Sequence, residues 1–164
     1  MTSFGYLHGR APEARDAAFL SRLYASTRTD LLYLPVPREV VDAIIRQQEL
    51  RQAQGYAQSF PHVRTLVLEH LGAPVGRLVL NEAPGELRVV DISVAPGERR
   101  RGHARSVLAA LQQRARLEGA SVTLRVRRDN PAARALYVSI GFEVSGGDEA
   151  SEQMRWTPSL DQNE

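Results

Sequence analysis

A run of arginines and small residues lies where a predicted strand passes directly into a predicted helix. In the segment VAPGERRRGHARSVLAA, which begins at Val94, an Arg-x-x-Gly-x-Ala pattern is formed by Arg99, Gly102 and Ala104. A helix N-terminus offers free backbone N–H groups and the positive end of the helix dipole, so it favours a phosphate. Gly102 lacks a Cβ that would keep a phosphate away from the backbone, and Ala104 leaves the first helical turn open. The segment therefore predicts a site for a ligand that carries a pyrophosphate.

The composition removes several classes of enzyme. All 21 basic residues are arginine, which excludes a Walker A loop, a pyridoxal Schiff base and a Lys–Ser hydrolase, because each needs a lysine. Gly97 and Gly102 do have the Walker spacing, but His103 and Ala104 stand where Lys and Ser or Thr are required. The absence of cysteine excludes thiolate catalysis and cysteine-based zinc sites. The remaining histidines show no metal-ligand spacing, so we predict no metal.

Length and charge bound the organisation of the chain and its partners. With 164 residues and 43% hydrophobic content, we expect one domain over residues 1–158 and a polar, disordered tail at 159–164. A net charge of only +2 argues against a nucleic-acid partner, which normally binds a broad basic face. No segment approaches the roughly 18 apolar residues of a membrane span, and no signal peptide is recognisable. We therefore predict a cytoplasmic protein with no membrane partner.

Hydrophobic periodicity indicates the elements that must position the arginine segment. An antiparallel meander of three strands is expected near residues 63–71, 73–81 and 86–95, and a weak first strand is expected from Phe4 to His8. Helices are expected after Pro12, from Pro37 to Gly55, from the arginine segment to Gly119, and after Asn130-Pro131. Further strands are expected at 121–128, at FEVSG and at EQMRWTP. The order strand, helix, strand around the arginine segment implies a right-handed crossover and a parallel pair, so the fold class is mixed α/β.

Two blocks of the chain resemble the GNAT superfamily of N-acetyltransferases. Residues 99–104, RRRGHA, match its Arg/Gln-x-x-Gly-x-Gly/Ala signature, and residues 130–142, NPAARALYVSIGF, are similar to its N-x-x-A-x-x-L/Y-x-x-x-G-F block. The resemblance covers about Val63 to Trp156 and is weak over the first 60 residues, where the acceptor is usually recognised. It implies the GNAT fold, a mostly antiparallel sheet of six to seven strands with a central parallel pair and about four flanking helices.

The resemblance also implies how a donor would bind. Acetyl-CoA is the implied donor, with its pyrophosphate held by backbone amides at the start of the helix. The pantetheine arm would pair like an extra strand around Ile92 to Val94, where the sheet splays open, and the Val94 N–H would stabilise the developing oxyanion. The cofactor-binding residues expected on this basis are Ile92, Val94, Arg99, Arg100, Arg101, Gly102, His103, Ala104, Arg105, Asn130 and Tyr137. The side chain of His103 itself is expected to face solvent.

Acyl transfer to an amine needs an acid and a base. Tyr137 matches the position of the family's usual proton donor to sulfur, and its alternative is an ordinary aromatic core residue. Asn130 matches a position that often bonds the pantetheine arm, and it also suits a helix cap. Asp91 is a carboxylate inside an apolar strand, where it must find partners, so it is a candidate base or a structural hydrogen-bonding group. Glu82, expected at the preceding turn, is a second candidate base, with a solvated turn carboxylate as its alternative.

The sequence thus predicts an N-acetyltransferase that transfers an acetyl group from acetyl-CoA to a primary amine of a small molecule or peptide by direct attack. Asp91, Glu82 and Glu86 would tolerate a cationic amine, and Tyr24, Arg28 and Asp30 stand where the family commonly builds an acceptor lid. The alternative is a non-catalytic module with a GNAT fold that binds or senses acyl-CoA. Whether Arg125, Arg127 and Arg128 approach the phosphates, and whether the chain forms a homodimer, stay open.

Overall fold

The computed structural model describes residues 1–159, and they form a mixed α/β fold. The tail expected at 159–164 therefore lies almost wholly outside the described residues. The strands are β1 (Thr2–Phe4), β2 (Leu7–Arg10), β3 (Val63–His70), β4 (Ala73–Ala83), β5 (Glu86–Val94), β6 (Ser121–Arg127), β7 (Glu143–Gly147) and β8 (Ser151–Trp156). The helices are α1 (Ala17–Thr27), α2 (Arg38–Ser59), α3 (His103–Glu118) and α4 (Pro131–Ser139), with short 3-10 turns η1 (Ala14–Asp16), η2 (Thr29–Tyr33) and η3 (Pro96–Glu98).

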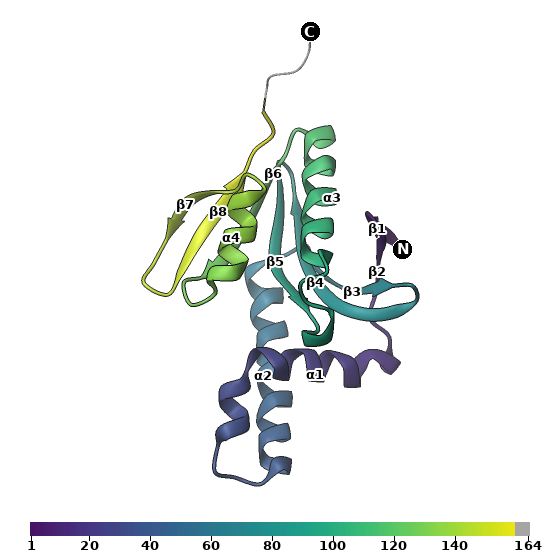
Figure 1. The fold of residues 1–164 in the computed structure, drawn as a ribbon, viewed down its shortest axis with the longest axis vertical. Coiled ribbons are helices and arrows are strands. Elements are labelled where there is room, and N and C mark those ends of the chain that lie inside the picture. The colour runs from purple at the N-terminus through teal and green to yellow at the C-terminus, as the bar shows by residue number, and fades with distance from the viewer. Residues whose placement is uncertain (160–164) are drawn as a thin grey trace.

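One sheet runs through the whole molecule in the order β1-β2-β3-β4-β5-β6-β8-β7 (Figure 1). All neighbouring strands are antiparallel except β5 and β6, which pair in parallel across the α3 crossover. The predicted fold class, the central parallel pair and the four helices are confirmed. The sheet has eight strands instead of the six to seven expected.

The additional strand comes from the N-terminus, where the sequence indicated one strand from Phe4 to His8. The chain instead turns back at Gly5 and Tyr6, so that Phe4 pairs with Leu7 in a tight hairpin. Gly5 has φ +67°, a conformation that glycine adopts without strain. Strands of three and four residues are too short for alternation to reveal them.

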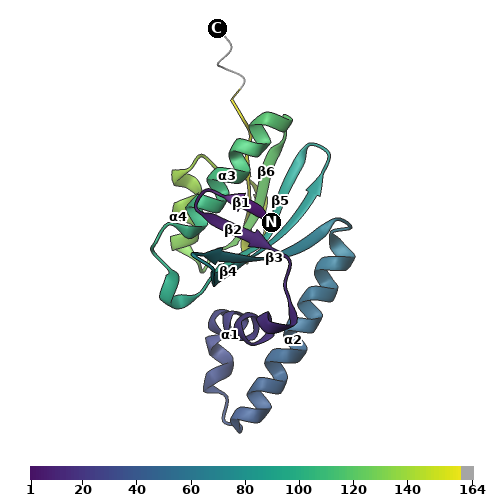
Figure 2. The same ribbon diagram turned by 90° about the vertical axis from the view of Figure 1, so that its right-hand side faces the viewer.

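The helices cover the two faces of the sheet unequally. Figure 2 shows α3 and α4 on one side of the sheet, with α1 and α2 extending beyond its lower end. The large core cluster joins one face of the sheet to α3 and α4, through Val107, Leu108, Leu111 and Tyr137 among others. A second, small cluster of Tyr24, Leu31, Val41 and Ile45 joins α1 to α2. Most of the hydrophobic core thus lies between the sheet and the helices α3 and α4. Helix α2 lies against the other face of the sheet, near β3 and β4.

The centre of the sheet opens where β5 leaves β6. The register between β4 and β5 shifts at Val90, because Val79 pairs with Asp91 while Leu80 pairs with Val89. A bulge of this kind bends a strand and increases its twist. Accordingly β5 pairs with β6 only from Glu86 to Val89, and its second half pairs with β4 alone. The splay that the family resemblance implies is present, and it gives β5 an open edge at residues 92–94.

Candidate functional site

The arginine loop (residues 97–102) connects the open edge of β5 to α3. Gly102 precedes the first residue of α3 and has φ +81°, and no side chain caps the helix start. Arg100 also has a positive φ, +63°. The first N–H groups of a helix have no partners within the helix, so the loop presents unpaired donors beside a left-handed glycine. This is the local geometry that the sequence predicts for binding a phosphate.

The exposed arginines surround this N-terminus and connect it to its neighbours. Arg99 donates from Nε to the Val94 carbonyl at 3.1 Å, and Arg101 lies 3.5 Å from a Glu98 oxygen. Arg105, in the first turn of α3, donates to Ser139 of α4 at 3.2 Å. These contacts leave most of each guanidinium exposed at the loop. The loop therefore combines free backbone donors with several positive charges.

The expectation that the His103 side chain faces solvent is wrong. The ring is buried, with only 2% of its surface exposed. It hydrogen-bonds with the Tyr6 hydroxyl at 2.8 Å and with Glu98 at 3.0 Å, and the hydrogen bond to Glu98 holds the pKa of that carboxyl below its usual value. The reason is the β1–β2 hairpin, which brings Tyr6 against the first turn of α3. His103 thus fixes the arginine loop between the hairpin and the helix.

We predict that this contact contributes to stability. Tyr6→Phe removes the hydroxyl that bonds both His103 and the Arg101 carbonyl, so the free energy of unfolding should fall by about 1–2 kcal/mol. Urea unfolding followed by circular dichroism measures this difference. Tyr33→Phe is the matched control, because Tyr33 is 86% exposed, and it should change stability by less than about 0.5 kcal/mol. Equal losses in the two variants would contradict the structural role of Tyr6.

The backbone of the open edge is oriented for pairing. The Ala95 N–H donates to the Val75 carbonyl of β4 at 2.8 Å. Because successive residues of a strand direct their N–H groups to opposite sides, the Val94 N–H is directed away from β4. No strand pairs with this side of β5 at Val94 among residues 1–159, because the pairing of β5 with β6 ends at Val89. An extended ligand could pair with this edge as an added strand does.

Tyr137 lies on α4, whose start is held by its own cap. Asn130 accepts a hydrogen bond from the Ala133 N–H at 3.3 Å, and Pro131 occupies the first turn. The ring of Tyr137 is 8% exposed and packs at 6.0 Å from Phe142. Burial and, to a smaller extent, the negative charge of Asp91 raise the pKa of Tyr137 to about 12. Tyr137 is therefore both a core aromatic and a phenol that stays protonated at neutral pH.

Asp91 is paired with an arginine that the sequence analysis did not single out. Its carboxylate lies 2.5 Å from Arg77 of β4 and accepts a hydrogen bond from Ser93 at 3.0 Å. Arg77 also donates to Gln52 of α2 at 3.3 Å. Both charged side chains are largely buried, with 26% and 17% of their surfaces exposed. An arginine inside an apolar strand is the same signal that drew attention to Asp91, and it could have identified Arg77.

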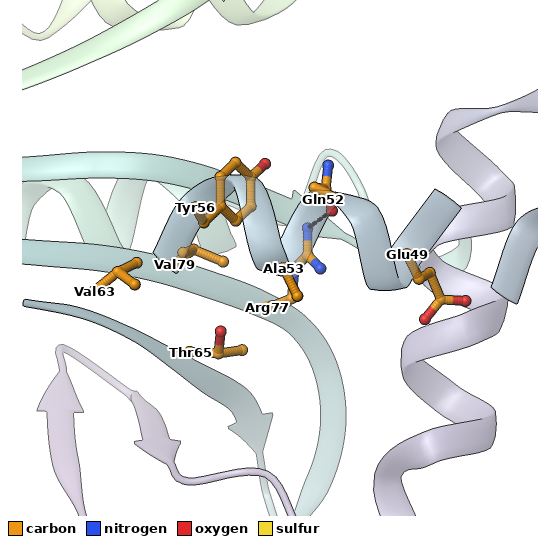
Figure 3. A pocket seen from close by; sticks show the side chains of 8 residues that line it. All are labelled: Glu49, Gln52, Ala53, Tyr56, Val63, Thr65, Arg77 and Val79. Carbon is orange, nitrogen blue, oxygen red and sulfur yellow. Dashed lines mark hydrogen bonds between the residues drawn. The ribbon is translucent and has the colours of Figure 1, made fainter. Parts of the chain in front are cut away.

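A small hollow lies between α2 and the face of the sheet that carries Asp91. Figure 3 shows the residues that line it, with Tyr56 and Gln52 pointing from α2 toward the strands. The hollow is lined by Glu49, Gln52, Ala53, Tyr56, Val63, Thr65, Arg77 and Val79. Its volume is about 80 Å³, which is room for a few water molecules. Burial raises the pKa of Tyr56 to about 12, with Asp91 contributing in the same direction.

Glu82 does not join this group. It lies inside β4, not at a turn. Its two carboxylate oxygens accept hydrogen bonds from Nη1 and Nη2 of Arg114, each at 2.9 Å, and one of them also pairs with Arg64 at 2.7 Å. Side chains alternate along a strand, so Glu82 lies on the face toward α3 while Val79 and Asp91 lie on the other. The arginines hold the pKa of Glu82 at about 2. An anion of such low basicity, on the wrong face, is not suited to accept a proton from an amine.

The pKa of Glu82 predicts a pH-dependent contribution to stability. Its folded value, about 2, lies below the usual value of about 4.3 for an unfolded chain. The contribution is therefore fully present above about pH 5 and is lost as the pH falls toward 2. Glu82→Gln should cost about 1–3 kcal/mol at pH 7, and that difference should shrink as the pH is lowered from 5 to 3. Urea unfolding of both proteins across this range measures it, and a constant difference would contradict the assignment.

Two negative findings apply to the structure of residues 1–159. No helix among them is long and apolar enough to cross a membrane. These residues also contain no group of three or more histidine and acidic side chains arranged to hold a metal ion.

Comparison with known proteins agrees with the fold and with the two sequence blocks. The model of the acetyltransferase (GNAT) family matches residues 21–142. No curated protein sequence matches the chain. Among solved structures, the PaiA N-acetyltransferase from Thermoplasma acidophilum in complex with coenzyme A has 16% identity and a TM-score of 0.66, covering 93% of this chain and 99% of its own.

Two other solved structures differ in the acceptor that their names indicate. Spermidine N-acetyltransferase from Vibrio cholerae, in complex with CoA and spermine, has 19% identity and a TM-score of 0.61, covering 93% of this chain and 95% of its own. The apo form of FdhC, a nucleotide-linked sugar GNAT, has 13% identity and a TM-score of 0.62, covering 93% and 86%. At such identities the likeness shows the fold alone.

Proposed function

Because the chain belongs to the GNAT family of acetyltransferases, we propose that it transfers an acetyl group from acetyl-CoA to the primary amine of a small molecule or peptide. One observation carries the proposal. The open edge of β5 leads directly into the arginine loop, and the charge of Asp91 on the same strand acts on Tyr137, so we propose that a single extended thioester contacts the edge, the loop and the phenol. The PaiA structure of the same fold contains coenzyme A, which supports acetyl-CoA as the donor.

The residues of this chain suit each part of that donor. The unpaired N–H groups at the start of α3 and the exposed arginines of the loop suit its phosphates. The outward Val94 N–H suits the thioester carbonyl, where it would donate to the oxygen as negative charge develops. Asn130 has its side-chain oxygen engaged with Ala133, so its amide N–H₂ is the group left for a pantetheine carbonyl.

The proposed reaction is a direct attack without a covalent enzyme intermediate. The neutral amine nitrogen bonds to the thioester carbon, the C–S bond breaks, and the sulfur leaves as a thiolate. With a pKa of about 12, Tyr137 is a weaker acid than a thiol, whose usual pKa is about 8.5. Tyr137 therefore donates a hydrogen bond to the leaving sulfur, and the proton lost by the amine balances the proton gained by CoA.

Asp91 is the carboxylate we propose for the acceptor amine. It is on the face of β5 that adjoins the hollow, and its charge acts on both Tyr56 and Tyr137. Since Arg77 already engages this carboxylate, we propose that Asp91 orients the amine and that a water molecule carries the proton away. Glu82 has no part in this proposal. A cytoplasmic location stays a prediction.

Release of free CoA thiol tests the proposed activity. Acetyl-CoA is supplied with a panel of small amines, amino acids, polyamines, aminoglycosides and peptides, and thiol is followed with a chromogenic disulfide. The protein adds no thiol background because it contains no cysteine. We expect release that depends on an acceptor. Tight binding of acetyl-CoA without release for any acceptor would instead support the acyl-CoA-binding module and contradict the enzyme.

A further inference from the structure

Arginines gather on the face of the sheet opposite α3 and α4. Thr123 of β6 is paired on one side with Arg88 of β5 and on the other with Arg155 of β8. Directly paired residues share a face, and Val122 and Leu124, which flank Thr123, are buried in the core on the other side. Arg88, Thr123 and Arg155 therefore form one row across three strands, which we call the arginine row.

Two polar atoms of this row are buried without a hydrogen-bond partner among residues 1–159. They are the Nε of Arg88 and the hydroxyl oxygen of Thr123, whose residue is only 4% exposed. A buried polar group without a hydrogen-bond partner lowers the stability of the folded state, and native proteins contain few such groups. Two such atoms at directly paired positions indicate that a ligand supplies the missing partner.

The charge of Arg88 is only partly compensated, by the carboxylate of Glu86 on the same strand. Its Nη1 donates at 2.9 Å to Gln153, a neutral side chain, and no salt bridge to Arg88 exists within the described residues. Its neighbours are already engaged, because Arg125 pairs with Asp148 at 3.2 Å and Arg155 approaches Glu86 at 4.0 Å. Burial lowers the pKa of Arg88, Glu86 partly opposes this, and Arg125 and Arg155 lower it further. A guanidinium nevertheless stays charged, so the row favours an anion.

We propose that the arginine row binds an anionic group, a carboxylate or phosphate, of the acceptor substrate. The proposal rests on the proposed function for the position of the amine. Arg88 pairs with Asn81 while Asp91 pairs with Val79, so the two positions are two residue pairs apart, about 7 Å along the strand, and on one face. A small acceptor with an amine at Asp91 could reach the row with its anionic end. Polyamines, which the acidic residues alone would suit, are disfavoured.

The first test observes anion binding without catalysis. The arginine Nε–H signals of ¹⁵N-labelled protein, saturated with CoA, are followed by NMR during titration with acetate and separately with inorganic phosphate. Arg88→Gln identifies the Arg88 signal by its loss. We expect that signal to shift to saturation with at least one anion, and the stronger anion indicates the group that the acceptor carries. An unmoved Arg88 signal, or equal shifts of all exposed arginines, would overturn the proposal.

The second test compares matched acceptors, 4-aminobutyrate, 3-aminopropylphosphonate and 4-aminobutyramide, whose amide end carries no charge. Arg88→Gln should raise KM for the better anionic acceptor at least tenfold, while KM for the amide changes less than twofold. The control is Arg127→Gln, because Arg127 lies on the same face but is 76% exposed and has its own partner, Asp129. Equal losses for the acceptors with and without an anionic end would overturn the inference alone. If no amine is acetylated while Arg88 still binds the anion, the proposed function fails and the anion site stands.

Discussion

Replacing Tyr137 by phenylalanine is expected to lower kcat about 100-fold while changing the affinity for acetyl-CoA less than about twofold. In the proposed reaction the phenol acts on the leaving sulfur only as the C–S bond breaks, and removal of such a group typically costs about 10²-fold or more. The ring would still pack against Phe142, so the fold should be retained. Steady-state kinetics and calorimetric titration with acetyl-CoA separate the two effects.

The pH profile adds a check on the same residue. Because the pKa of Tyr137 is raised to about 12, its protonated form persists through neutral and mildly alkaline pH. No loss of kcat that depends on Tyr137 should therefore occur between pH 7 and pH 10. A tenfold fall in affinity with unchanged kcat would assign Tyr137 to donor binding, and no change in either constant would leave it an aromatic core residue.

Gly102→Val is expected to weaken acetyl-CoA binding by at least about 30-fold. Gly102 has φ +81°, which a β-branched residue adopts only with strain, and its Cβ would stand at the surface where we propose that the phosphates approach the backbone. Because the helix N-terminus supplies the donors at this point, even a small displacement removes several hydrogen bonds together. Calorimetric titration with acetyl-CoA and with CoA measures the loss.

Gly85→Val is the control for backbone strain. Gly85 has φ +78° with nothing within 4 Å of a Cβ, and it lies in the turn between β4 and β5. Both variants should lose stability to a similar extent, but only Gly102→Val should lose donor affinity. Similar affinity in the Gly102 variant and the wild type would show that the arginine loop does not hold the phosphates.

Local signals in the sequence predicted those parts of the site that depend on neighbouring residues in the chain. Gly102 at the start of α3 and the Asn130 cap with Pro131 are of this kind, because a few neighbouring residues determine the local backbone conformation. The opening of β5 was predicted through the family resemblance. The sequence also marked Asp91 as a buried carboxylate that needed a partner.

The remaining features depend on contacts between distant segments. The burial of His103 depends on its contact with Tyr6, which lies in the β1–β2 hairpin, 97 positions earlier in the chain. The pairing of Asp91 with Arg77 depends on a register that shifts at Val90. Glu82 was expected at a turn, but β4 continues to Ala83, so alternation directs it toward α3. Gln52 and Tyr56 belong to α2, for which periodicity indicated only an apolar face.

The most direct test of the account is the amide hydrogen exchange of Val94 with and without acetyl-CoA, measured by NMR. If the pantetheine arm pairs with the open edge of β5, exchange at Val94 should slow at least tenfold when the donor is bound, together with amides at the start of α3. Binding of acetyl-CoA that slows exchange at the start of α3 but leaves Val94 unchanged would contradict the account, because the donor would then lie elsewhere than between the arginine loop and Tyr137.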